Sequence, residues 1–142
     1  MITIEEFLRA ANQMRDYYAK KIKDSFEEYR FSPNEISILI VLKNNKTITT
    51  STELKVVLGV SKALISRSVD SLEKKGLIQV YKDVQDSRVS HLKLTTQSQP
   101  VLEKVDEEIG KLNEQLCLDI SEEEMRIFIQ TLNKMRERFK EF

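Results

Sequence analysis

Residues 50–95 constrain the fold more than any other part of this chain. A helical segment ends there at Gly59, a second begins at Ser61 and ends at Gly76, and two segments rich in β-forming residues follow. Glycine takes the left-handed conformation that often closes a helix, so it suits both stops. This order predicts a helix-turn-helix followed by a β-wing. In such a unit the second helix can lie in the major groove of DNA while the wing reaches the backbone or the minor groove.

Residues 61–75 are expected to form the second helix of this unit, with two different faces. Ile65, Val69 and Leu72 recur at helical spacing and predict a buried stripe. The opposite face carries mostly short or basic side chains, with which a helix can approach the edges of bases. Its members are Lys62, Ala63, Ser66 and Arg67, with Leu64 and Ser71 toward the flanks.

The wing is predicted over residues 77–94. Its strands are expected at 77–82 and 89–94, where β-forming residues are frequent, and the polar residues 83–88 would connect them. Residues 47–49 are a candidate for a short further strand that pairs with the wing.

The charge of the chain is distributed unevenly although its total is zero. Residues 1–42 carry 6 basic and 7 acidic side chains, and residues 96–142 carry 7 basic and 11 acidic ones. Residues 43–95 carry 10 basic and 5 acidic side chains, a net charge of +5. Phosphate binding depends on local charge, so the coincidence of this block with the helix-turn-helix favours DNA as a partner.

The rest of the chain has the periodicity of amphipathic helices. The spacing predicts a first helix from Thr3 to Tyr29 or Arg30, a central helix that is apolar nearly all round after Ser32, and two helices within residues 98–142. Ser98 is the expected cap before Pro100. Four pairs have the spacing of a capping box: Thr3 and Glu6, Ser32 and Glu35, Thr50 and Glu53, and Ser121 and Glu124.

The bulk properties indicate one domain. The chain has 142 residues, of which 40% are hydrophobic and 32% charged, enough for a real core. It has no apolar stretch of about 20 residues and no leader-like N-terminus, so we expect no membrane partner. Its single cysteine, Cys117, excludes an internal disulfide framework and favours a cytoplasmic location.

Features of enzymes and of metal sites are missing from the sequence. It has no nucleophile elbow and no phosphate-binding glycine loop, and a lone histidine, His91, makes no metal site. We therefore expect no catalytic residue, no cofactor and no metal. Cys117 lies between Leu116 and Leu118 and is expected to be a buried apolar side chain, with redox sensing as the alternative.

The order of these elements resembles the MarR family of bacterial transcription regulators over nearly the whole chain. The sequence resemblance is strongest from Leu54 to Thr95. The chain there reads L-G-V-S-K, then L-E-K-K-G-L-I, then D-x-x-D-x-R from Asp83 to Arg88, and finally L-T. Each motif is weak alone, but their order and spacing together are specific.

The resemblance implies a homodimer and one domain, 1–142, that is mainly α-helical with a small β-wing. Residues 1–31 and 98–142 would form the dimerisation helices, and residues 32–95 would form the winged helix-turn-helix. The recognition helices, 61–75, of the two subunits would enter successive major grooves of an inverted repeat in double-stranded DNA.

The resemblance also assigns roles to single residues. Arg88 would reach the minor groove, and Asp86 would orient it through a salt bridge. The chain departs from the family's usual residues at Leu64 and Ser68, so the base preference stays open. Contacts of the recognition helix are expected from Ser61, Lys62, Ser66 and Arg67.

These observations predict a sequence-specific transcription regulator, most simply a repressor, whose DNA affinity a small-molecule effector changes. Two alternatives are a winged-helix protein-interaction module without DNA binding and an architectural DNA binder with little sequence preference. The basic recognition face argues against the first, and a specificity ratio of about 10³ or more would argue against the second. Candidates for an effector pocket, with ordinary packing as the alternative, are Tyr17, Tyr18, Tyr29 and Arg30.

Overall fold

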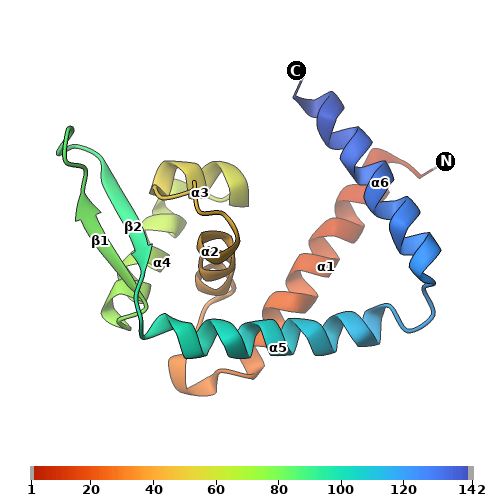
Figure 1. Cartoon of the computed structure of the whole chain (residues 1–142), viewed down its shortest axis with the longest axis horizontal. Helices are drawn as coiled ribbons and strands as arrows, with labels where there is room; N and C mark the ends of the chain where they lie inside the picture. The colour runs from red at the N-terminus through yellow and green to blue at the C-terminus, as the bar shows by residue number, and fades with distance from the viewer. Residues whose placement is uncertain (1, 141–142) are drawn as a thin grey trace. The chain divides into compact units, whose positions relative to one another are not determined.

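The computed structural model describes residues 2–140 as a mainly helical chain with one β-hairpin (Figure 1), which confirms the expected fold class. It forms two compact units, one ending at residue 109 and the other beginning at residue 110. No helix in the described range is long and apolar enough to cross a membrane. The elements are α1 (Ile4–Asp24), η1 (Glu27–Tyr29), α2 (Pro33–Asn44), α3 (Ser51–Leu58), α4 (Lys62–Lys74), β1 (Ile78–Lys82), β2 (Ser90–Leu94), α5 (Ser98–Leu116) and α6 (Glu122–Phe139).

The starts of four helices are fixed by the capping boxes that the sequence predicts. At each start the Ser or Thr side chain accepts the N–H of the Glu three residues on, and that Glu carboxylate accepts the N–H of the cap residue. These bonds satisfy backbone donors that have no partner within the helix. The boxes begin at Thr3 in α1, Ser32 in α2, Thr50 in α3 and Ser121 in α6.

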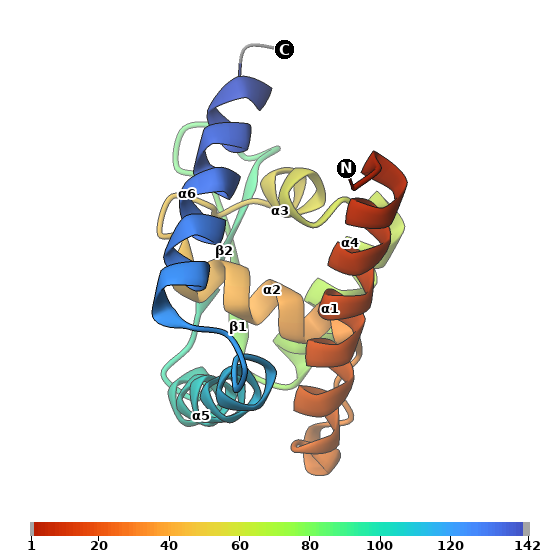
Figure 2. The same cartoon turned by 90° about the vertical axis from the view of Figure 1, so that its right-hand side faces the viewer.

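α2 lies at the centre of the first unit (Figure 1 and Figure 2). It contacts α1, α3, α4 and β2, and Ile36, Ile38 and Leu39 are fully buried. Ile65 and Leu72 of α4 are buried as well. Burial of a side chain of this size is worth roughly 1.5–3 kcal/mol, so α4 is held with this face inward and its opposite face toward solvent.

The wing forms as the sequence predicts, within one residue at the ends of its strands. β1 and β2 are antiparallel, with Val80 opposite Leu92 and Tyr81 opposite His91. The expected strand at 47–49 is reduced to a single bridge between Thr50 and His91.

The first helix is shorter than its periodicity predicts. α1 ends at Asp24 rather than at Tyr29 or Arg30. The chain then turns so that Phe26, which is buried, packs edge-to-face against Phe31 with 5.7 Å between the ring centres. Arg30 takes the left-handed conformation, with φ of 50°, and leads the chain into α2. The burial of Phe26 outweighs the helical pattern here.

The start of α5 also differs from expectation. Ser98 is the first helical residue rather than the cap, and its hydroxyl donates to the Thr95 carbonyl at 2.6 Å. Pro100 lies in the first turn, where it displaces no helical hydrogen bond.

A buried ion pair joins the start of α2 to the end of α4. Glu35 is 3% exposed, and its carboxylate accepts the Ser32 N–H at 2.6 Å and a hydrogen bond from Lys75 Nζ at 2.7 Å. Lys75 also donates to the Ser71 hydroxyl at 3.1 Å and lies 5.1 Å from the centre of the Phe31 ring. The capping box predicts only the local role of Glu35, not its pairing with Lys75.

Two opposing influences act on the pKa of Glu35. Burial is the largest single one and would raise it, but hydrogen bonds from Lys75, Ser32 and Ser71 and the Lys75 charge together lower it below 4.5. The carboxyl is therefore charged at neutral pH. Its contribution to stability is present above pH 4.5 and is lost as the pH falls through the lowered pKa.

Replacing Lys75 by Met should destabilise the protein by about 2–4 kcal/mol at pH 7, because it leaves the buried Glu35 charge without its partner. The Lys75 side chain is 22% exposed, so we expect a smaller loss of stability than for a fully buried ion pair. Urea unfolding measures the difference. Lys74→Met, at the exposed neighbour in the same helix, is the matched control and should change stability by less than about 0.5 kcal/mol.

The same variant gives a test in acid. Without Lys75, the pKa of Glu35 should be higher than in wild type, because burial is then opposed only by the hydrogen bonds from Ser32 and Ser71. Lowering the pH should therefore neutralise the carboxyl more readily and reduce the penalty. The stability gap between wild type and Lys75→Met should therefore shrink from pH 7 to pH 4. A gap of equal size at both pH values contradicts the assignment to Glu35.

Candidate nucleic-acid interface

α4 begins at a sharp turn after α3. Gly59 has φ of 63° and closes α3 in the left-handed conformation, and Ser61 is extended. The Ser61 hydroxyl then accepts the N–H of Leu64 at 3.2 Å and caps α4. Ser61 thus has a structural role that does not depend on DNA, and its predicted DNA contact stays a prediction.

The outward face of α4 brings together most of the residues predicted to contact DNA. Ile65, Ser68, Val69 and Leu72 are buried, so the helix exposes its other side. Ser71 is half-buried and its hydroxyl accepts a hydrogen bond from Lys75, which separates it from the others. Of the residues predicted to contact DNA from this helix and its cap, the exposed ones are Ser61, Lys62, Ala63, Leu64, Ser66 and Arg67.

The wing loop holds Arg88 through Asp86. The guanidinium donates from Nε and a terminal nitrogen to the two carboxylate oxygens at 3.0 and 3.1 Å, and the Arg88 backbone N–H donates at 3.0 Å. The hydrogen bond from the Arg88 side chain lowers the pKa of Asp86, and the same bond raises the pKa of Arg88. The arginine side chain is 88% exposed, so Asp86 orients its guanidinium while the side chain stays open to solvent.

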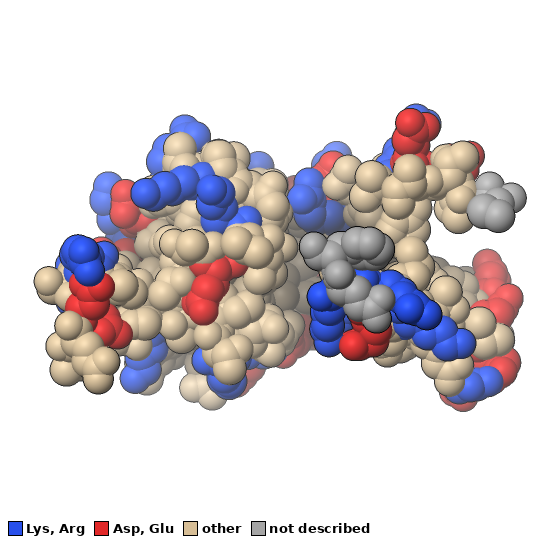
Figure 3. All heavy atoms as spheres, turned by 90° about the horizontal axis from the view of Figure 1, so that it is seen from above, with Lys and Arg blue, Asp and Glu red and all other residues tan. Residues whose placement is uncertain are grey.

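Basic side chains are exposed over the helix-turn-helix and the wing (Figure 3, left half). In the described part of the chain neither Lys62 nor Arg67 has an acidic partner within ion-pair distance. Their charges are therefore available to an anionic partner, whereas an existing ion pair would first have to be broken.

Two contacts that the sequence does not predict fix the wing to α4. The Glu73 carboxylate of α4 accepts the Val80 N–H of β1 at 3.0 Å. The Thr95 hydroxyl donates to the Gly76 carbonyl at 2.6 Å, at the other end of the hairpin from its loop. Neither pair has a local sequence pattern, since the partners come together only when the hairpin folds back onto the helix.

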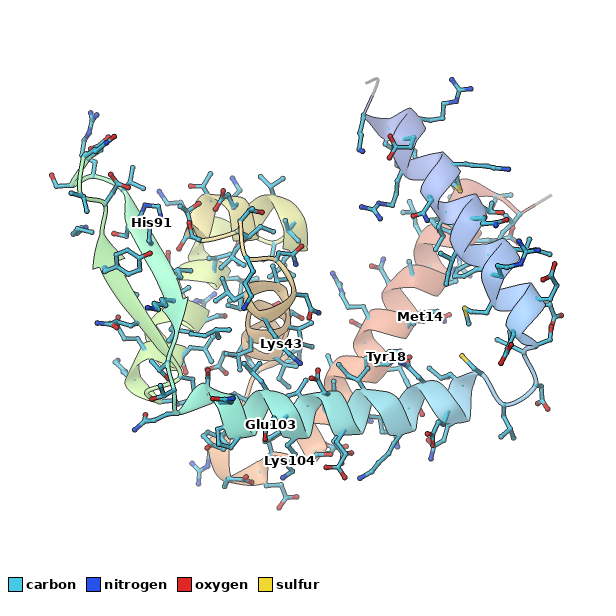
Figure 4. The ribbon with its side chains drawn as sticks, viewed as in Figure 1. Met14, Tyr18, Lys43, His91, Glu103 and Lys104 are labelled. Carbon is cyan, nitrogen blue, oxygen red and sulfur yellow. The ribbon has the colours of Figure 1, made fainter. Side chains whose placement is uncertain are left out.

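An apolar pocket of about 520 Å³ lies in the first unit, between α1 and α2. Tyr18, Ala19 and Ile22 line it from α1, and Ile36 and Val41 from α2. Figure 4 marks Met14 and Tyr18, two of its lining residues, on α1.

The four predicted pocket residues do not lie together. Only Tyr18 lines the apolar pocket, and Tyr17 meets Tyr18 edge-to-face. Tyr29 stacks on Phe31 at 5.0 Å, and Arg30 borders a separate pocket beside η1.

The lone cysteine follows α5 and lies outside this interface. Cys117 is a free thiol and is half-buried rather than fully buried. Within residues 2–140, no group of three or more metal-binding side chains gathers in one place.

Comparison with known proteins supports the resemblance inferred from the sequence. The model of the MarR family matches residues 31–90. The fold is similar to that of wild-type MarR from E. coli in its apo form, with 23% identity, coverage of 95% of this chain and 97% of that one, and a TM-score of 0.75. A MarR protein from Peptoclostridium difficile has 22% identity, 99% and 94% coverage, and a TM-score of 0.79. S. aureus MepR, in a complex with DNA, has 22% identity, 97% and 99% coverage, and a TM-score of 0.72.

Removing the cap of α4 should weaken the protein measurably. We expect Ser61→Ala to lower the free energy of unfolding by about 1 kcal/mol, since the Leu64 N–H loses its partner. Ser66→Ala, at an exposed serine of the same helix, should change it by less than about 0.5 kcal/mol. Urea denaturation measures the free energy of unfolding of the two variants. An equal loss in both would show that the cap is not what stabilises this turn.

Proposed function

Because residues 31–90 match the MarR family model and the fold matches MarR proteins along nearly the whole chain, we propose that this protein is a homodimeric, sequence-specific DNA-binding transcription regulator. Most simply it is a repressor in the cytoplasm whose DNA affinity an effector changes. The observation that carries the proposal is the capped helix α4, whose exposed face presents Lys62 and Arg67, neither of which forms an ion pair with another described residue.

The proposed DNA contacts follow from this geometry. The first turns of α4 would enter the major groove, where Arg67 can bind a phosphate or a guanine edge. Arg88, exposed on the wing and oriented by Asp86, would enter the minor groove, whose negative potential attracts arginine. S. aureus MepR, which has a similar fold, was solved in a complex with DNA, and this supports DNA as the partner proposed here.

A dimer is proposed because apolar side chains lie exposed on helices outside the winged core. Ile4, Leu8 and Met14 of α1 are each more than half exposed. On α6, Phe128 and Phe139 are at least half exposed. Exposure of several large apolar side chains to water is unfavourable, so a partner is expected to cover them. A second copy of the chain is the partner that the family resemblance suggests. Two copies would place their recognition helices on half-sites about 10 bp apart.

The pocket between α1 and α2 is the proposed effector site. Its lining is largely apolar, with Arg15, Tyr18 and Ser37 as its polar members, so it would suit a small, mainly apolar molecule. One wall belongs to α1, which we place at the dimer interface, and the other to α2, which contacts α4. A molecule bound there would contact both a helix of the proposed dimer interface and a helix that packs against the recognition helix.

Selection from a random duplex library at about 150 mM salt tests the proposed function. An enriched inverted repeat supports a dimeric regulator. If the protein retains duplexes without enriching any sequence, it is an architectural binder. If it retains no duplex, a protein-interaction module is indicated.

On the selected duplex, Arg67→Ala and Arg88→Ala should each weaken binding by roughly 5- to 150-fold, the effect of removing about 1–3 kcal/mol of binding free energy. Each should also reduce the slope of log K against log salt by about one for every phosphate that the side chain binds in the wild type. Fluorescence anisotropy over a salt series measures both. Arg136→Ala, at an exposed arginine of α6, is the control. Unchanged affinity and slope in both test variants would refute the assigned contacts.

Filling the pocket should abolish the effector response. Small aromatic and aliphatic molecules are screened for stabilisation of wild type, which should reach about 2.7 kcal/mol at 100 times Kd. Val41→Phe places a ring among the lining residues and should remove the stabilisation. Asn12→Phe adds the same ring on exposed α1, outside the lining, and should not. Molecules that stabilise both variants equally bind elsewhere.

A further inference from the structure

His91 is the point at which side chains from four segments of the first unit meet; Figure 4 marks its position on β2. Its Nε2 lies 2.7 Å from Asp83 Oδ2, and its Nδ1 lies 2.8 Å from Thr49 Oγ1. Its ring stacks on Tyr81 of β1, with 5.4 Å between ring centres. Since Asp83 begins the wing loop and Thr49 lies just before α3, His91 connects the wing with the helix-turn-helix.

Asp83 extends this connection to the wing loop. Its second oxygen, Oδ1, accepts the N–H groups of Gln85 at 2.8 Å and Asp86 at 2.9 Å. Asp86 in turn holds the backbone and guanidinium of Arg88. The hydrogen bond from His91 is the largest influence that lowers the pKa of Asp83, so this carboxylate is charged at neutral pH. An unbroken series of hydrogen bonds therefore runs from His91 to Arg88.

Thr49 fixes the other end of the series. Its N–H donates at 2.8 Å to Glu53, the residue that closes the capping box of α3. Its carbonyl accepts the Leu92 N–H at 2.6 Å. α3 in turn contacts α4. Thr49 is thus held on one side by the helix-turn-helix, through Glu53, and on the other by β2 of the wing, through the Leu92 N–H.

The pairing of the strands does not itself require a histidine at this position. Ile78 and Leu92 supply the buried side of the hairpin, and the backbone register continues on both sides of His91. The polar contacts of His91 are additional to strand pairing. Their effect is on the loop, because Asp83 is the residue that they hold.

We propose that His91 is a positioning residue that holds the wing loop, and with it Arg88, in place relative to the helix-turn-helix. The inference rests on the proposed DNA-binding function, since Arg88 is the group that would be positioned. One measurement below uses the free protein and the other uses DNA. A failure of the positioning role can therefore be distinguished from a failure of the proposed DNA binding.

The first measurement is hydrogen exchange of the free protein. His91→Leu should accelerate exchange of the Gln85 and Asp86 amides by roughly five- to tenfold, the factor that corresponds to the removal of one hydrogen bond. Amides in α4 should be unchanged. Gln79→Leu is the matched control, because Gln79 is an exposed residue of β1 opposite Lys93, on the same sheet face as His91. Unchanged exchange of the loop amides in His91→Leu overturns the proposal.

The second measurement is a double-mutant cycle on the duplex selected above. His91→Leu should weaken DNA binding by roughly fivefold in wild type and by less than twofold beside Arg88→Ala, because residues that act through each other are not additive. Equal factors in the two backgrounds overturn the proposal, since they would mean that His91 acts independently of Arg88.

Two further variants separate positioning from loss of folding. His91→Gln keeps an amide donor that can reach Asp83 and should restore most of the affinity. Thr49→Val removes one hydroxyl and should reproduce part of the loss with little change in Tm. If wild type binds no duplex, the proposed function fails, and the exchange data alone then decide whether His91 holds the loop.

Discussion

The ion pair between Glu35 and Lys75 sets how α4 lies against α2, and the outward face of α4 depends on it. Apolar packing through Ile65 and Leu72 holds the two helices together but is not directional. The ion pair is directional, because the carboxylate is fixed at one oxygen by the Ser32 N–H and at the other by Lys75. Such a pair adds little stability over well-packed apolar side chains, yet any arrangement that breaks it is costly. It therefore favours one orientation of α4 over its neighbours.

The wing depends on contacts of the same kind, since a two-stranded hairpin is marginally stable alone. At its base, Glu73 and Thr95 tie it to α4 and to the turn at Gly76. At its far end, the loop is held to the segment before α3 through His91 and Asp83. The exposed α4 face and Arg88 are thus linked through polar side chains, while the core beneath them is apolar. Directional contacts place the groups that would meet DNA, and apolar burial holds the unit together.

The sequence predicts the local parts of this structure well and its long-range contacts poorly. The capping boxes, Gly59, the stripe of Ile65, Val69 and Leu72, and the two strands were all predictable, because each depends on residues within one turn or one strand. The end of α1 was not, since it depends on Phe26 packing against Phe31. Glu35 with Lys75 and His91 with Asp83 and Thr49 were not predictable either. Their partners are brought together by the tertiary fold, and no spacing in the sequence records such a pairing.

Two consecutive residues of α2, Glu35 and Ile36, suggest how the proposed effector site would act on DNA binding. Ile36 lines the apolar pocket, while Glu35, the preceding residue, holds Lys75 at the end of α4. A bound molecule can change DNA affinity only by its preference for one position of α2 over another. A preference of about 1–3 kcal/mol is sufficient for such coupling. Because the ion pair is more directional than the apolar contacts, a small shift of α2 would act on α4 mainly through Glu35. The most conformation-sensitive contact of the core would then also be the one through which regulation passes.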